Sequence, residues 1–185
     1  MLGATVATPT ILSILQSCKN ETRVSWQPLF FSPTEASTVA SLVDAILPRT
    51  DTPGALDVKV DVFIDRVIAK TYDEKGHENM RTEIAAFNSG CETDFGAPFH
   101  ELDQEQKEAV LKSAEESSGN FNPNIWGKTV GEQEPVKFYR SLKSMAIWAY
   151  FTSEEIGENV LNYLPVPGVY EGCKAVSEIG NRWSL

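Results

Sequence analysis

The sequence predicts an all-α fold. Helix-start patterns recur along the chain, the apolar residues behind them repeat with the period of an amphipathic helix, and no alternating run is long enough to build a sheet. We expect an irregular helical domain of about five to seven helices and an extended carboxyl-terminal arm. In residue numbers, 1–29 form an export leader and linker, 30–164 the helical domain, and 165–185 the arm.

Length and charge narrow the class of protein. The chain has 185 residues, of which 42% are apolar and 23% charged, as expected for one globular domain with a core. Its net charge of −10 and the lack of a basic stripe argue against a nucleic-acid-binding protein. The same charge disfavours electrostatic docking onto an anionic membrane surface.

The leader is the least polar part of the sequence. Residues 1–17 carry no charged side chain, and their length suits the apolar region of a signal peptide better than a transmembrane helix. The next residue is Cys18, and LQSC at 15–18 is similar to a bacterial lipobox, in which the cysteine is acylated. We therefore expect an exported protein, periplasmic or membrane-anchored and facing the periplasm. A buried amino-terminal helix is the alternative.

The first helix of the domain has clear start and stop signals. Residues 32–35, SPTE, form a capping box with proline at the first helical position, and apolar residues follow with helical period as far as Pro48. The segment 46–55, ILPRTDTPGA, then concentrates turn-forming residues. This corner is either a tight loop between helices or a shaped surface that a partner uses.

The remaining helices follow in order. We expect a second from Asp61 to about Gly76, a third ending before Gly90, a fourth opened by the capping box at 103–106, a fifth over 135–150, and a short sixth from Thr152 to about Leu164. A polar loop at 117–134 separates the fourth from the fifth.

The arm begins with LPVPGVYEGC at 164–173, which is incompatible with a regular helix. Three aromatic residues, Tyr163, Tyr170 and Trp183, lie in it or near it. Such an arm either lies in a partner's groove or packs back on its own helices.

Residues with catalytic or metal-binding patterns are scarce. Neither His77 nor His100 has the i,i+4 partner of a helical metal site, and no phosphate-binding loop or nucleophile elbow occurs. If Cys18 carries lipid, Cys91 and Cys173 remain and form either a disulfide or two separate thiols. We expect no catalytic residue, no cofactor and no metal in this chain.

Two segments carry a resemblance to a known family. FFSPTEASTVASLVDAILPRTDTPGA at 30–55 and YFTSEEIGENVLNYLPVPGVYEGC at 150–173 resemble the hallmarks of the gluconate 2-dehydrogenase subunit 3 family, and ELDQEQKEAVL at 101–111 is similar to the start of its middle helix. The resemblance covers about residues 30–185.

The resemblance implies a non-catalytic small subunit of an exported sugar dehydrogenase complex. Its expected partner is an FAD-containing flavoprotein of the glucose-methanol-choline (GMC) type, which this subunit helps to fold and export; a c-type cytochrome with haem c is a further expected partner. The sugar is not fixed by the family name.

We expect the corner, the arm and aromatic anchors to make the contact surface, and the candidate residues are Pro48, Thr50, Pro53, Gly54, Trp126, Trp148, Pro167, Gly168, Tyr170 and Trp183. Two other functions stay open at this point. One is a free-standing lipoprotein with an apolar ligand pocket, and the other is an enzyme that uses Cys91 or His100.

Overall fold

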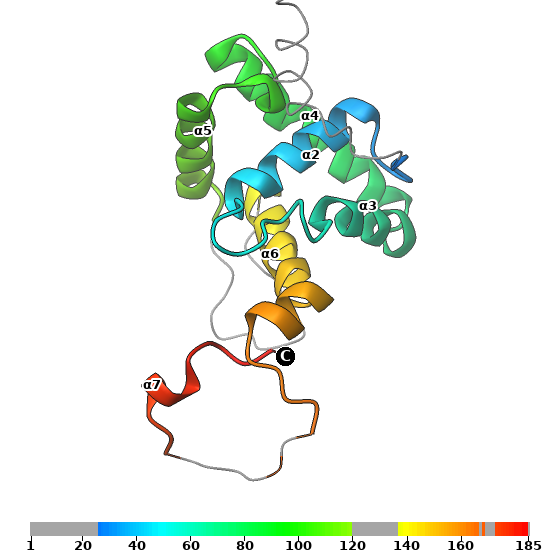
Figure 1. Cartoon of the computed structure of the whole chain (residues 1–185). Helices are drawn as coiled ribbons and strands as arrows, with labels where there is room; N and C mark the ends of the chain where they lie inside the picture. Colours follow the sequence, from blue (N-terminus) through cyan, green and yellow to red (C-terminus); the bar gives the residue numbers. More distant parts are fainter. Residues whose placement is uncertain (1–25, 120–136, 167, 169–172, 185) are drawn as a thin grey trace, which may run out of the picture.

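The computed structural model describes residues 26–119, 137–166, 168 and 173–184, and it confirms the all-α prediction for them. Figure 1 shows a body of packed helices, with a loop that contains α7 extending from the end of α6. The elements are α2 (Pro33–Ile46), α3 (Val60–Thr71), α4 (Glu74–Phe95), η2 (Phe99–Glu101), α5 (Gln104–Ser117), α6 (Phe138–Phe151), η3 (Ile156–Val160) and α7 (Val176–Ile179).

Two predicted capping boxes are present. At the start of α2, the Ser32 hydroxyl accepts a hydrogen bond from the Glu35 amide at 3.3 Å, and the Glu35 carboxylate accepts one from the Ser32 amide at 2.7 Å. Asp103 and Gln106 make the same reciprocal pair at the start of α5. Each box satisfies amide groups that the helix leaves without an intrahelical partner.

The predicted end of the third helix before Gly90 is wrong. Helix α4 continues to Phe95 and is capped by Gly96 in the left-handed region, at a φ of 81°. Glycine inside a helix costs about 1 kcal/mol relative to alanine. Burial of Cys91, one residue further on, favours continuation of the helix despite that cost.

The second and last helices are shorter than predicted. Helix α3 ends at Thr71 because Asp73 already caps α4, its carboxylate accepting a hydrogen bond from the Gly76 amide at 2.8 Å. The last predicted helix corresponds to η3, which ends at Val160, where the Leu161 amide donates to the Ile156 carbonyl at 2.9 Å. It does not reach Leu164, because the backbone of Asn162 pairs with residues near the end of the chain.

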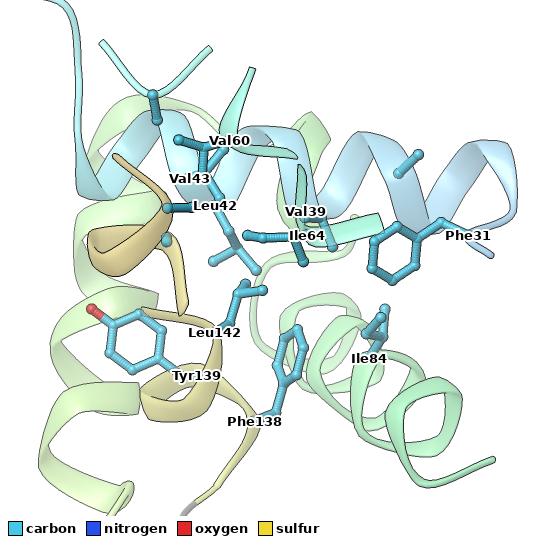
Figure 2. Close-up of a cluster of buried hydrophobic side chains, with 14 of the residues drawn as sticks. Phe31, Val39, Leu42, Val43, Val60, Ile64, Ile84, Phe138, Tyr139 and Leu142 are labelled. Atoms are coloured by element: carbon cyan, nitrogen blue, oxygen red, sulfur yellow. The ribbon is translucent and has the colours of Figure 1, made fainter. Parts of the chain in front are cut away.

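The core lies where α2, α3, α4 and α6 meet (Figure 2). Helix α6 packs on α3, while α2 packs on η2 and α3. The largest fully buried apolar side chains are Val39, Leu42 and Val43 of α2, Val60, Ile64 and Ile68 of α3, Ile84 of α4, Phe99 of η2, Leu142 of α6 and Ile156 of η3. A continuous core of this kind fixes the relative positions of the corner and the end of α6.

A buried carboxylate fastens the segment before α2. Asp65 of α3 is fully buried and accepts hydrogen bonds from the amides of Leu29, Phe30 and Phe31, at 2.7, 3.0 and 3.0 Å. The Arg81 guanidinium lies 4.4 Å from the centre of the Phe30 ring and donates to the Phe30 carbonyl at 2.7 Å. Three amide donors on one carboxylate form strong, charge-assisted bonds that hold the segment in place.

Candidate partner-binding surface

The inner side of the corner is built into the helical body. Ala55 is fully buried, its amide donates to the Leu47 carbonyl at 2.8 Å, and the Tyr150 hydroxyl of α6 donates to the Pro53 carbonyl at 2.7 Å. A Cβ added at Gly54 would lie 2.6 Å from the backbone nitrogen of Arg49. The predicted residues Pro53 and Gly54 therefore set the shape of the corner, and Gly54 itself is buried.

The outer side of the corner is polar. Pro48, Arg49, Thr50 and Asp51 are exposed. Arg49 pairs with Asp57, whose carboxylate also accepts a hydrogen bond from the Gly54 amide at 2.7 Å. A shallow hollow of about 490 Å³ lies over these residues and extends to Glu155, just before η3. The hollow thus connects the corner with the segment between α6 and η3.

Helix α6 presents an exposed aromatic side chain near its carboxyl-terminal end. Trp148 is 55% exposed, although it contacts Phe63 of α3 with ring centres 5.5 Å apart. Tryptophan is enriched among the residues that dominate binding interfaces, so an exposed tryptophan on a helix of the core is a candidate anchor. Trp148 is the best-placed of the predicted anchors among the described residues.

The arm folds back at its end. Asn162 donates its amide to the Arg182 carbonyl at 2.8 Å and accepts from the Ser184 amide at 2.9 Å, which places Trp183 beside Asn162. Of the two expectations for the arm, packing back holds for residues 181–184. Tyr163, Leu164, Val166 and Trp183 nevertheless stay at least half exposed.

Four predicted residues lie outside the part of the chain that the structure describes: Trp126, Pro167, Tyr170 and the lipidation candidate Cys18. Gly168 is described and exposed. Among the described residues, the candidate surface residues are therefore Pro48, Thr50, Trp148 and Trp183, together with the exposed apolar residues of the arm.

The two remaining cysteines are not bonded to each other. Cys91 is buried and Cys173 is exposed, and both are free thiols in this structure, which corresponds to the alternative of two separate thiols. Burial, together with the neighbouring charge of Asp94, raises the pKa of the Cys91 thiol to about 11. A thiol held neutral in this way lacks the thiolate character of a catalytic cysteine.

The two histidines have structural contacts. His77 Nε2 donates to the Ile68 carbonyl at 2.8 Å, and its ring lies 4.7 Å from that of Phe30. His100 Nδ1 lies 3.3 Å from the Thr38 hydroxyl, which also contacts Asn88. The described residues contain no group of three potential metal ligands. In the same part of the chain, no helix is long and apolar enough to cross a membrane.

A second concave feature lies between α4, α5 and the start of α6. It has a volume of about 620 Å³, and its apolar lining includes Phe87, Cys91, Phe95, Val110 and Phe138. Ser118 and Lys137 also line it, and the chain between them includes 120–136, outside the described residues. We call this feature the α4–α5 groove. No motif in the sequence predicts it, because its lining comes from three helices.

Two further residues have structural roles that no sequence pattern indicates. Asp65 looks like an ordinary polar position on an amphipathic helix, and Asn162 looks like a polar residue after a short helix. Each forms hydrogen bonds to backbone groups far away in the sequence. Only the fold brings those partners together, so no local pattern signals either role.

The fold and the surface define a small all-helical protein with exposed aromatic and apolar side chains at one end. The family model of gluconate 2-dehydrogenase subunit 3 matches residues 33–168, which is most of the chain, and the chain belongs to this family. The matched residues include the corner, all of α6 and the first part of the arm. Comparison with characterised proteins gave no match, and comparison with solved structures gave none either.

Proposed function

We propose that this chain is the non-catalytic small subunit of a periplasmic or membrane-associated sugar or glycoside dehydrogenase complex. In this proposal, it binds an FAD-dependent catalytic subunit of the GMC type and supports the folding and export of that subunit. Electrons pass from the flavin to a c-type cytochrome where the complex contains one. Membership of the gluconate 2-dehydrogenase subunit 3 family, over residues 33–168, is the observation that carries the proposal.

The surface of the chain supports a binding role. Trp148, Tyr163, Leu164, Val166 and Trp183 are exposed apolar side chains on α6 and the arm. Exposed apolar groups of this kind mark protein–protein or membrane interaction sites when they gather. Cys91 and His100, the residues of the enzyme alternative, are engaged in packing and in a hydrogen-bond network.

Export and lipid attachment at Cys18 are part of the same proposal. They rest on the uncharged residues 1–17 and the LQSC sequence. Replacement of Cys18 by serine tests the anchor, because the protein should then leave the membrane fraction and no longer incorporate radiolabelled palmitate. Continued incorporation in the serine variant would place the acyl chain elsewhere.

The main test is purification of the chain from its native cells. We expect a flavoprotein to copurify, with the absorption bands of oxidised flavin in the complex and none in the isolated chain. The variant Trp148→Ala should weaken the complex by about 30-fold, as expected for an interface hot spot of about 2 kcal/mol.

The matched control is Leu29→Ala. Leu29 is also an exposed apolar residue, but it lies on the segment that Asp65 holds, and its hydrogen bond comes from the backbone. This variant should bind like the wild type. A purified single chain without any flavoprotein would contradict the proposed function.

The α4–α5 groove favours a second candidate function, the binding of a small apolar ligand. Its volume of about 620 Å³ is in the usual range for ligand pockets. The probe 8-anilinonaphthalene-1-sulfonate should bind the wild type, and Ala109→Trp, which narrows the groove, should reduce its fluorescence. Lys112→Trp on the same helix lies outside the lining and serves as the control. Equal fluorescence in all three proteins would exclude this candidate.

A further inference from the structure

Asn162 occupies a central position at the base of the arm. Its backbone bonds to Arg182 and Ser184, and its side-chain amide donates to the Ile179 carbonyl at 2.6 Å and also to that of Asn181. An asparagine side chain has two N–H donors, so both bonds are available to it at once. In return, the Asn181 side chain donates to the Val160 carbonyl at 2.7 Å.

A second set of contacts holds the end of the chain, at Arg182 and Ser184, against the helical body. The Arg182 guanidinium lies 4.6 Å from the centre of the Phe151 ring, in the last turn of α6. A Cβ added at Gly157 of η3 would lie 3.9 Å from the Ser184 Cβ, so the two backbones pass close to each other. Asn162 is therefore held against residues 182–184, so the described residues 163–166 and 173–181 lie on the two limbs of a loop that is closed at its base, and Figure 1 shows the described end of the chain returning to that base.

The closed loop presents apolar side chains. Tyr163 and Leu164 are 50% and 51% exposed, Val166 is 79% exposed, and Trp183 is 50% exposed beside Asn162. Because both ends of the loop are fixed, Tyr163 and Trp183 are presented from neighbouring positions at its base. Ordering a loop before binding lowers the entropy cost of association.

The border of this surface is acidic on the side of η3. Glu154, Glu155 and Glu158 are exposed there, and the sequence from 152 to 173 contains no lysine or arginine, whereas the exposed cations Lys174 and Arg182 lie on the returning part of the chain. The complementary partner surface is an apolar recess bordered by lysine and arginine side chains.

We propose that Asn162, with Asn181 and Arg182, forms a latch, and that the latched loop binds a recess of this chemistry on the catalytic flavoprotein. The inference rests on the proposed function for the identity of the partner. The latch acts on binding by holding the side chains of Tyr163, Leu164 and Trp183 in their bound positions, so Asn162 is a positioning residue. When the latch opens, the same side chains are present but are no longer held in position. The partner then has to order them on binding.

The first test compares Asn162→Ala with Asn159→Ala. Asn159 lies three residues earlier and bonds to Glu155 rather than to the arm. We expect Asn162→Ala to raise the Kd for the flavoprotein at least tenfold and Asn159→Ala to leave it within twofold. In the isolated chain, Asn162→Ala should also speed proteolytic cleavage within 163–182 at least tenfold, with an unchanged helical circular dichroism spectrum.

Arg182 supplies a second variant that does not touch the hydrogen bonds of Asn162. Arg182→Ala should raise the Kd and the cleavage rate in the same direction, and Arg182→Lys should restore part of each, because a lysine retains a cation for the Phe151 ring. The acidic border is tested by Glu154→Gln combined with Glu158→Gln. This pair should slow association at low salt several-fold, whereas Glu92→Gln on α4 should not.

The results separate the two proposals. If the wild type binds no flavoprotein, the proposed function fails and the docking part fails with it, while the cleavage rates still decide whether the latch exists. If the wild type binds and the Asn162 and Arg182 variants bind equally well, the inference is overturned and the proposed function stands. If the wild type forms a dimer that Asn162→Ala dissociates and binds no flavoprotein, the loop's partner is a second copy of the chain.

Discussion

At the scale of single residues, the corner depends on the absence of a side chain at Gly54. The chain reverses tightly there, with the backbone of Pro48 and Arg49 directly over Gly54. The short side chains around Gly54 make the turn. Glycine itself is necessary because the backbone of Pro48 and Arg49 comes so close to this position. The corner is therefore a structural unit that shapes the surface near α6.

The variant Gly54→Ala tests this point. Its Cβ would lie 2.6 Å from the Arg49 nitrogen and 3.0 Å from the Pro48 carbonyl carbon, so backbone must move. We expect a loss of about 1–3 kcal/mol in the free energy of unfolding, measured by urea denaturation. Gly90→Ala is the control, because that helical position has open space around it and should gain about 0.5–1 kcal/mol. Equal stability of the two variants would contradict the close approach.

Cys91 is the second residue with a measurable consequence. Burial raises its pKa from the ordinary 9.0 to about 11, so above pH 9 the unfolded chain loses this proton more readily than the folded chain. The stabilising contribution is complete below pH 9 and is lost as the pH rises toward 11.

Urea titrations at pH 8 to 11 should therefore show stability falling more steeply for the wild type than for Cys91→Ala. Alkylation with iodoacetamide at pH 8 provides the control, because it should modify the exposed Cys173 and leave Cys91 intact in the folded protein. Parallel pH profiles for the two proteins would show that Cys91 has no such effect.

At the scale of elements, helices α5 and α6 are joined by a charged cluster. The Glu115 carboxylate pairs with Arg140 at 2.8 Å and with Lys143 at 2.7 Å. The hydrogen bond from Lys143, with the charges of Lys143 and Arg140, lowers the pKa of Glu115. A lowered pKa stabilises the fold above the unfolded value of 4.5, and this contribution disappears as the pH falls through the folded value.

The variant Glu115→Gln should lose about 0.5–1 kcal/mol at pH 7, since the cluster is partly exposed and screened by solvent. Thermal denaturation should show that the difference from the wild type shrinks below pH 4.5 and at high salt. Glu116→Gln, which changes an exposed neighbour, should have little effect. A difference that persists at low pH would point to packing rather than charge.

Local signals explain why several elements were predictable. The capping partners of α2 and α5 lie three residues apart, so the sequence alone displays them. The end of α4 was missed because it depends on burial of Cys91 against other helices. The Asp65 contacts span 34 to 36 residues and the bonds of the Asn162 side chain span 17 to 19, which is beyond any local pattern.

The candidate site likewise has parts that local sequence signals predict and parts that depend on the fold. The resemblance at 30–55 predicts the corner, but its inward-facing half depends on the hydrogen bond from the Tyr150 hydroxyl of α6 to the Pro53 carbonyl, which no local pattern signals. The residue type of Trp148 predicts an anchor. Its exposure depends on how α6 packs on α3, which the sequence does not show. The α4–α5 groove had no signal in the sequence.

At the scale of the whole molecule, exposed apolar side chains on α6 and the arm suggest that the chain is less stable alone than in a complex. A ligand that binds only the folded state stabilises it by RT ln(1 + [L]/Kd), or about 2.7 kcal/mol at 100 times the Kd.

We therefore expect the addition of purified flavoprotein to raise the thermal midpoint of this chain in a concentration-dependent way. The signal to follow is the loss of helical circular dichroism, with bovine serum albumin at equal mass as the control. A midpoint that does not move at saturating flavoprotein would mean that the two proteins do not bind.

The buried carboxylate of Asp65 has a consequence for hydrogen exchange. The amides of Leu29, Phe30 and Phe31 lie before the first residue of α2, where amides usually exchange quickly with solvent deuterium. Because their acceptor is buried in α3, they exchange only when this segment separates from that helix. Their exchange rates therefore report the separation of residues 29–31 from α3, independently of events at the carboxyl-terminal loop.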